Sequence, residues 1–195
     1  PALRALRGLY ERRGEWDRVV DVLRRETEVL ADPTEKAILL FRAAEIRELR
    51  SGHSDQAAEL YQEALGYQPG HLPALRALER LFARAGAWRE LAAVYERLLA
   101  AAAPGEREGV YRQLASLYLD RLDQPAKAAA CLEAVLEAAP EDPAALLALE
   151  RLSLKQGAFA RVPDLRARLA GLAVAGDAAS DLLLGAALVE EHLAE

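Results

Sequence analysis

The residue types that most often bind metals or act as nucleophiles are few in this chain and lie far apart. His53 and His71 stand in turn-like segments, and His192 lies near the end of the sequence. None has the His-x-x-x-His or Glu-x-x-His spacing that places two metal ligands on one helix face. Cys131 is the single cysteine and stands beside Leu132 in an apolar stretch, which is typical of a small core residue. The sequence predicts no metal site, no internal disulfide and no reactive thiol.

Acid–base and phosphate-binding patterns are also missing. The glycines do not form a phosphate-binding loop; Gly14, Gly86 and Gly157 are spaced as helix stops. The acidic residues of one segment are interpreted as an exposed helix end: Glu133, Glu137, Glu141 and Asp142. We therefore expect neither an enzyme nor a cofactor.

Composition favours a helical, water-soluble protein. The 195 residues contain 52% hydrophobic and only 6% aromatic side chains, with neither methionine nor asparagine. This bias favours helix over sheet. The net charge of -6 argues against a general nucleic-acid binder, and charged residues interrupt every apolar run too often for a membrane span. Because the chain starts at Pro1 rather than methionine, we expect a piece of a longer protein.

An internal repeat organises the whole chain. The segment 1–16, PALRALRGLYERRGEW, recurs 72 positions later as PALRALERLFARAGAW, and residues 148–159, ALERLSLKQGAF, form a third copy. A second kind of unit lies between these copies, because residues 57–69 recur as 128–140. Two units of some 35 residues alternate, which is the length of one helix-turn-helix hairpin in a solenoid.

Helix punctuation divides these units into five hairpins and a terminal helix. Asp32-Pro33 and Asp142-Pro143 are predicted helix starts, and Pro163 is expected in the first turn of its helix. The predicted hairpins are 1–31, 33–69, 72–103, 105–140 and 142–175, followed by a helix over 177–195, all in a single domain, 1–195. Trp16, Trp88 and Phe159, which follow the turn glycines, are predicted to pack in the core between hairpins.

The second helices carry a resemblance to a known family. AAELYQEALGYQP, residues 57–69, and its copy AAACLEAVLEAAP, residues 128–140, resemble the second helix of a tetratricopeptide repeat. Leu114-Ala115 with Tyr118 resembles the first helix. The resemblance implies an all-α, right-handed superhelix of stacked hairpins. The odd hairpins depart from it, because Arg7, Glu79 and Glu150 replace the family's small residue, and we expect looser packing there.

The resemblance also implies a binding surface, since first helices line the concave face in this family. Mapped in this way, basic side chains project toward one shared surface, which we expect to accept an acidic peptide or a partner's C-terminus. The predicted residues are Arg4, Arg12, Arg76, Arg80, Arg84, Arg112, Arg151 and Lys155. The alternative interpretation is solvated surface or intramolecular pairing, for which Glu11, Glu45 and Glu48 are the expected partners.

The predicted function is a non-catalytic protein–protein interaction scaffold. One alternative is homodimer formation through the terminal helix, whose apolar residues Leu182, Leu183, Leu184, Ala187, Leu188 and Leu193 would cover the preceding hairpin only partly. An alternative of another class is an RNA-binding helical repeat, which the net acidity disfavours. A membrane partner is not expected.

Overall fold

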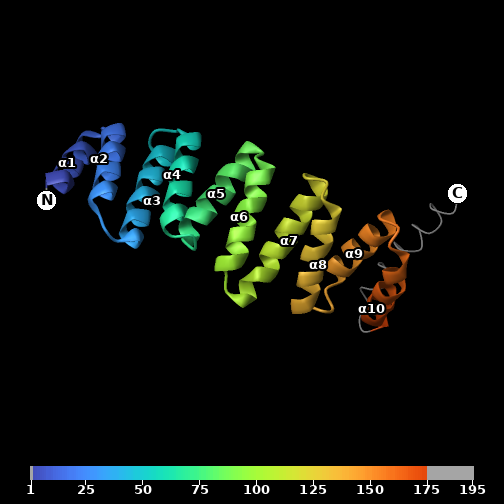
Figure 1. Ribbon diagram of the computed structural model, residues 1–195. Coiled ribbons are helices and arrows are strands. Elements are labelled where there is room, and N and C mark those ends of the chain that lie inside the picture. The colour runs from blue at the N-terminus through green and yellow to red at the C-terminus, as the bar shows by residue number, and fades with distance from the viewer. Residues whose placement is uncertain (1, 175–195) are drawn as a thin grey trace. The chain divides into compact units, whose positions relative to one another are not determined.

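The computed structural model describes residues 2–174, and this stretch consists of ten α-helices and one 3-10 turn without a strand (Figure 1). The first helices of the hairpins are α1 (Ala2–Arg13), α3 (Pro33–Leu49), α5 (Leu72–Ala85), α7 (Pro104–Asp120) and α9 (Pro143–Lys155). The second helices are α2 (Trp16–Val29), α4 (Ser54–Tyr67), α6 (Trp88–Ala101), α8 (Pro125–Ala138) and α10 (Val162–Val174). The all-α prediction and the five hairpins are confirmed, while the predicted helix over 177–195 lies outside the described residues.

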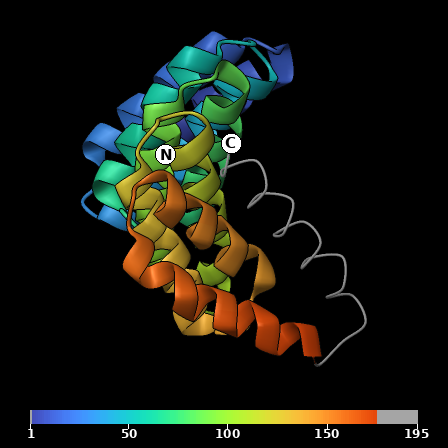
Figure 2. The ribbon, with the colours of Figure 1, turned by 90° about the vertical axis from the view of Figure 1, so that its right-hand side faces the viewer.

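The helices form two compact units. Unit 1 is Pro1–Ala103 and holds α1 to α6, and unit 2 is Pro104–Glu195 and holds α7 to α10. Within each unit every helix contacts the next one along the chain, both inside a hairpin and from one hairpin to the next. Figure 2 shows the same neighbour relationship for α9 and α10 from a second direction. Each hairpin therefore buries its apolar face against its sequence neighbours, as in helical repeat arrays.

The predicted helix starts are present. The Asp32 carboxylate accepts a hydrogen bond from the Thr34 amide at 2.9 Å, and the Asp142 carboxylate accepts one from the Ala145 amide at 2.6 Å. Proline follows each aspartate at the first helical position, where no intrahelical amide bond is lost. Pro163 lies in the first turn of α10, as predicted, after the 3-10 turn η1 (Phe159–Arg161). None of the described helices is long and apolar enough to cross a membrane.

The turn after each odd first helix needs a left-handed residue. Gly14, Gly86 and Gly157 all have φ between 67° and 70°, a conformation that side chains disfavour. A Cβ atom at Gly86 would also lie 3.7 Å from the Trp88 ring. Repetition of this turn explains why the same short motif recurs in the sequence.

The aromatic residues beside these turns correct a prediction. Trp16 and Trp88 are only half-buried, and Phe159 is 65% exposed, so they do not form the core between hairpins. Their position at or just before the start of a second helix puts them at the end of the hairpin, over the turn glycine. The Arg50 guanidinium lies over the Trp16 ring, 5.2 Å from the ring centroid.

The even hairpins have the closest helix packing. Alanine is fully buried at Ala43, Ala44, Ala57 and Ala64, and α3 and α4 contact each other along more of their length than the helices of the odd hairpins. Small side chains allow the two backbones to approach closely. The looser packing predicted for the odd hairpins is therefore observed.

Candidate interaction sites

Polar pairs join the two helices of each odd hairpin at the position where the family's small residue is replaced. Their members are Arg7 with Glu26, Glu79 with Tyr95, and Glu150 with Arg166. The Glu150 carboxylate accepts from Arg166 Nε at 2.6 Å, and its residue is 5% exposed. Replacement of the small residue thus introduces a charged group, to which the second helix supplies either an opposite charge or a hydroxyl donor.

In two hairpins of unit 1, a tyrosine hydroxyl on the second helix donates a hydrogen bond to a glutamate on the first helix. Tyr61 on α4 donates to Glu48 on α3 at 2.9 Å, and Tyr95 on α6 donates to Glu79 on α5. Burial, with the negative charge and hydrogen bond of Glu79, raises the pKa of Tyr95 to about 12. Burial and Glu48 raise the pKa of Tyr61 as well. Tyr95 is buried between the two helices of its hairpin.

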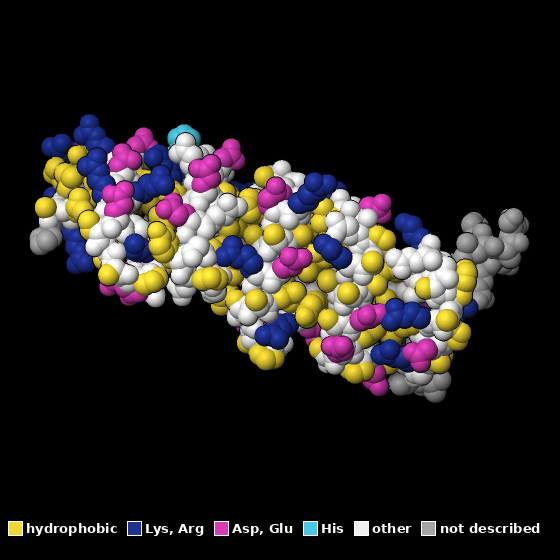
Figure 3. Space-filling model, in the orientation of Figure 1, with side chains coloured by type: hydrophobic (Ala, Val, Ile, Leu, Met, Phe, Trp, Pro, Cys, Tyr) yellow, Lys and Arg dark blue, Asp and Glu magenta, His cyan; other side chains and the backbone are white. Residues whose placement is uncertain are grey.

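The basic residues predicted in unit 1 lie on α1 and α5. Arg4 and Arg12 are exposed and have no ion-pair partner among residues 2–174. Arg76, Arg80 and Arg84 follow one side of α5 at intervals of four residues. Figure 3 shows basic and acidic side chains interspersed over this unit, with Lys and Arg gathered at the end that holds α1.

The three arginines of α5 are paired with carboxylates of unit 1. Arg76 contacts Glu79 at 2.9 Å, whereas Arg84 and Arg80 both reach Glu48, at 3.1 and 3.8 Å. Glu48 has a side chain only 8% exposed, while those of Arg80 and Arg84 are mostly exposed. The sequence therefore named the correct neutralising residue in Glu48, and Arg80 and Arg84 converge on one carboxylate.

The remaining predicted residues belong to unit 2. Arg112 binds Glu108 at 2.5 Å and also Asp142, so its charge serves to join α7 to the start of α9. These two hydrogen bonds raise the pKa of Arg112, and the Arg112 bond is the main cause that lowers the pKa of Asp142. Arg151 and Lys155 are exposed on α9, one turn apart, and neither forms an ion pair within the described part of the chain.

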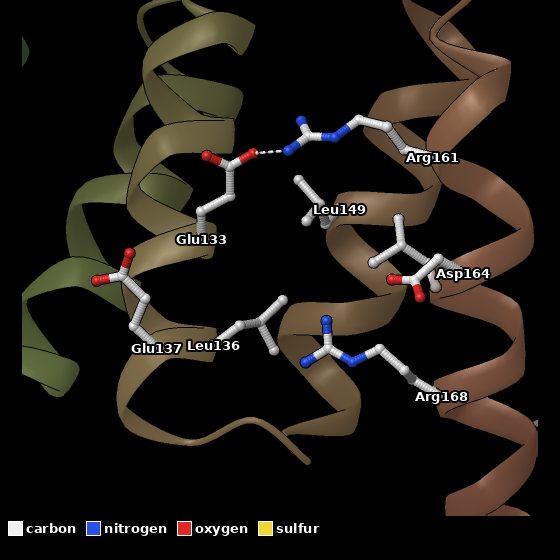
Figure 4. Close-up of a pocket in the computed structure, with 8 residues that line it drawn as sticks. Glu133, Leu136, Glu137, Leu149, Arg161, Asp164 and Arg168 are labelled. Atoms are coloured by element: carbon white, nitrogen blue, oxygen red, sulfur yellow. Dashed lines mark hydrogen bonds and ion pairs between the residues drawn. The ribbon is translucent and has the colours of Figure 1, made fainter.

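Glu137 and Glu141 are exposed at the helix end, as expected, whereas Asp142 and Glu133 have structural partners. Asp142 caps α9 and binds Arg112, and Glu133 binds Arg161. Glu133 and Arg161 lie at one rim of a hollow of about 470 Å³ between α8 and α10, the α8–α10 hollow. Figure 4 shows Leu136 and Leu149 at its base and Glu137, Asp164 and Arg168 around it. Charges of both signs surround this hollow, so it favours no single class of ligand.

A larger hollow of about 930 Å³ lies in unit 1 and was not predicted. This α1–α3 hollow is lined by the first turns of α1, the end of α2 and the first half of α3. Its lining residues are Ala2, Leu3, Arg4, Arg7, Glu26, Val29, Leu30, Glu35, Ile38 and Leu39. The sequence held one signal for it, because Glu26 stands where the copy 72 residues later has Leu98.

The histidines and the cysteine have structural surroundings. Nδ1 of His71 accepts from the Ala74 amide at 3.2 Å and so caps α5, and burial lowers the pKa of His71. His71 is half-buried, whereas His53 is exposed. Cys131 is buried on α8, and His192 lies outside the described residues. Among the residues that the structure describes, no three His, Cys, Asp or Glu side chains gather as metal ligands.

Comparison with known families now identifies the repeat. A model of the tetratricopeptide repeat matches residues 2–37 and 74–109. The two matched segments are tetratricopeptide repeats. The matched segments cover the first and third hairpins and the start of the helix that follows each, whereas the resemblance in the sequence was clearest in the second helices of the even hairpins.

Several solved structures are similar to this chain over most of its length, at low sequence identity. MamA from Desulfovibrio magneticus RS-1 is 16% identical with a TM-score of 0.46, and the match covers 90% of this chain and 96% of that one. A tetratricopeptide repeat protein from Parabacteroides merdae is 18% identical with a TM-score of 0.48, covering 88% and 66%. YrrB, described as a TPR protein with an unusual peptide-binding site, is 18% identical with a TM-score of 0.47, covering 68% and 66%. A search of the curated proteins finds no match.

Proposed function

We propose that this tetratricopeptide-repeat chain is a non-catalytic scaffold that binds an acidic segment of another protein along the basic first-helix surface of unit 1. Stacked helical hairpins present extended surfaces suited to such partners. The proposed contact residues are Arg4, Arg12, Arg76, Arg80 and Arg84. Unit 2 by itself carries a second proposed set of contacts, Arg112, Arg151 and Lys155, of which Arg112 is the least available because two carboxylates already bind it.

The observation that carries this proposal is the convergence of Arg80 and Arg84 on the Glu48 carboxylate. The same two guanidinium groups have the reach and the spacing to hold one carboxylate together. Their side chains are 61% and 65% exposed, so an incoming carboxylate meets them without a change in the helices. Arginine is suited to this contact because its planar group donates several hydrogen bonds at once.

The test is binding of a fluorescein-labelled peptide of twelve glutamates, followed by anisotropy at low salt. The triple variant Arg76→Glu, Arg80→Glu and Arg84→Glu is expected to lose binding while its far-UV circular dichroism stays unchanged. The matched control is Arg18→Glu, Arg24→Glu and Arg89→Glu, which makes the same charge change with exposed arginines of second helices. An equal loss of binding in the control would mean that the effect comes from net charge alone. Retained binding by the first variant would eliminate the proposed surface.

A further inference from the structure

The first hairpin differs from its copy at a buried position between its helices. Glu26 is 6% exposed at the end of α2, and the equivalent residue of the third hairpin, Leu98, is fully buried. Arg7, which pairs with Glu26, stands where the copy has Glu79. Positions that agree between copies maintain the common scaffold, so this exchange of an apolar residue for an ion pair calls for a reason specific to the first hairpin.

The exchange lies beside the α1–α3 hollow. Apolar side chains from three helices form its wall: Leu3, Leu30, Ile38 and Leu39. Two of its apolar lining residues are unusually open, since Val29 is 75% and Ile38 51% exposed. A hollow of about 930 Å³ exceeds the volume of any single side chain. Exposed apolar surface around a concave site is typical of a binding site rather than of a hairpin's free surface.

Glu26 contributes an unsatisfied acceptor to this site. Its Oε2 accepts from Arg7, but its Oε1 is buried and has no hydrogen-bond partner among the described residues. A buried carboxylate oxygen without a donor is costly, and most such atoms in proteins have a partner. Within residues 2–174 the site therefore lacks one hydrogen-bond donor.

Two other hairpins of unit 1 show which donor suits such a glutamate. Tyr61 donates to Glu48 and Tyr95 donates to Glu79, each from a ring packed between the helices. In the first hairpin the residue equivalent to Tyr95 is Leu23, which has no hydroxyl. A lysine is a poorer donor here because Arg4 and Arg7 line the same hollow and would repel its charge.

We propose that the α1–α3 hollow binds a tyrosine side chain of a partner protein, with the ring against Leu30, Ile38 and Leu39 and the hydroxyl donating to Glu26. The site goes beyond the proposed function, since of the residues proposed to bind an acidic segment only Arg4 lines this hollow. An uncharged aromatic ring fits the apolar wall, and its hydroxyl supplies the missing donor. A neutral, tyrosine-bearing segment would therefore be recognised here.

Isoleucine methyl NMR of the whole chain tests this site, because Ile38 and Ile46 are the only two isoleucines in the sequence. Ile38 lines the hollow and Ile46 does not, so Ile46 is an internal control. On titration with N-acetyl-tyrosinamide, the Ile38 signal is expected to shift and the Ile46 signal to stay. N-acetyl-phenylalaninamide is expected to bind roughly tenfold more weakly, since it lacks one hydrogen bond to a charged group. Equal affinities for the two amides, or no shift of Ile38, would overturn the proposal.

Single substitutions test whether Glu26 causes the preference for tyrosinamide over phenylalaninamide. Glu26→Leu, the residue of the copy, is expected to remove the roughly tenfold advantage of tyrosinamide. If this variant loses helix content, Val29→Trp serves instead, because it narrows the hollow from an exposed position and should weaken both amides. Leu49→Trp, at a position 72% exposed and outside the hollow, should leave both affinities unchanged. The triple variant of Arg76, Arg80 and Arg84 should still bind tyrosinamide, so this site can be tested separately from the proposed acidic-segment surface. A preference for tyrosinamide that survives Glu26→Leu would refute the proposal that Glu26 accepts the hydrogen bond.

Discussion

The Tyr61 hydroxyl donates to the Glu48 carboxylate at 2.9 Å, from α4 to α3. The same carboxylate accepts from Arg84 on α5 at 3.1 Å, so one buried acidic group joins three helices of unit 1. This group also holds two of the arginines that we propose for partner binding. Glu48 is therefore both a structural residue and an internal competitor for an incoming carboxylate.

Replacement of Glu48 should reveal this competition. Glu48→Gln keeps an acceptor for Tyr61 but removes the charge that binds Arg80 and Arg84, so the glutamate peptide should bind severalfold more tightly at low salt. The free energy of unfolding should fall by about 1 kcal/mol, since a charged hydrogen bond becomes a neutral one. Anisotropy and urea unfolding measure the two effects. Glu63→Gln, which releases only Arg24, is the control, and equal tightening in both variants would reduce the effect to net charge.

The left-handed turn residues should resist substitution. Gly86→Ala is expected to lower the free energy of unfolding by about 1 kcal/mol, because φ at this position is +67°, a left-handed conformation that side chains disfavour. Gly109→Ala lies inside α7 with open space around it and should instead stabilise by roughly 0.5 kcal/mol. Chemical unfolding of both variants gives the comparison, and a neutral Gly86→Ala would show that the turn tolerates a side chain.

Asp142 should stabilise unit 2 in a pH-dependent way. Asp142→Ala removes both the cap of α9 and the partner of Arg112, and a loss of about 1–2 kcal/mol is expected. Asp142→Asn keeps the cap and loses only the ion pair. Because Arg112 lowers the pKa of Asp142 below its ordinary value of 3.8, the advantage of aspartate over asparagine is present above pH 3.8 and disappears as the pH falls through the folded-state value. A difference that persists in strong acid would contradict this account.

Because of Tyr95, the free energy of unfolding of unit 1 should depend on pH in alkaline solution. Its pKa is raised from 10.0 to about 12 by burial and by Glu79, so folding favours the protonated hydroxyl. The corresponding stability is fully present below pH 10 and is lost as the pH rises toward about 12. Tyr95→Phe should therefore flatten the dependence of the free energy of unfolding on pH in this range, which urea unfolding at several pH values measures.

The local features of the fold were predictable because they depend on neighbouring residues. The Asp32-Pro33 and Asp142-Pro143 starts and the glycine turns follow from backbone preferences over three or four positions. The repeat then implied that hairpins with matching apolar faces stack on one another. The looser odd hairpins were predictable too, since Glu79 and Glu150 are too large for the alanine-lined contact of α3 and α4.

The candidate sites were predictable only in part. The sequence placed Arg80, Arg84 and Glu48 near one another through the family's geometry, and the structure shows the pairing. It also predicted core positions for Trp16 and Phe159, which the turn geometry leaves at the hairpin ends, and it did not predict the α1–α3 hollow.

Sequence periodicity by itself determined that the chain folds as helical hairpins, because helix length, caps and apolar spacing are local properties. Tertiary packing alone decided that Glu26 is buried with one oxygen that finds no donor in the described part of the chain, and that Arg84 reaches a carboxylate 36 residues away. These outcomes depend on how one helix is rotated and shifted against the next. A difference of a few ångströms between helices determines whether a charged side chain meets a partner, a hollow or solvent, and no short-range pattern encodes that distance.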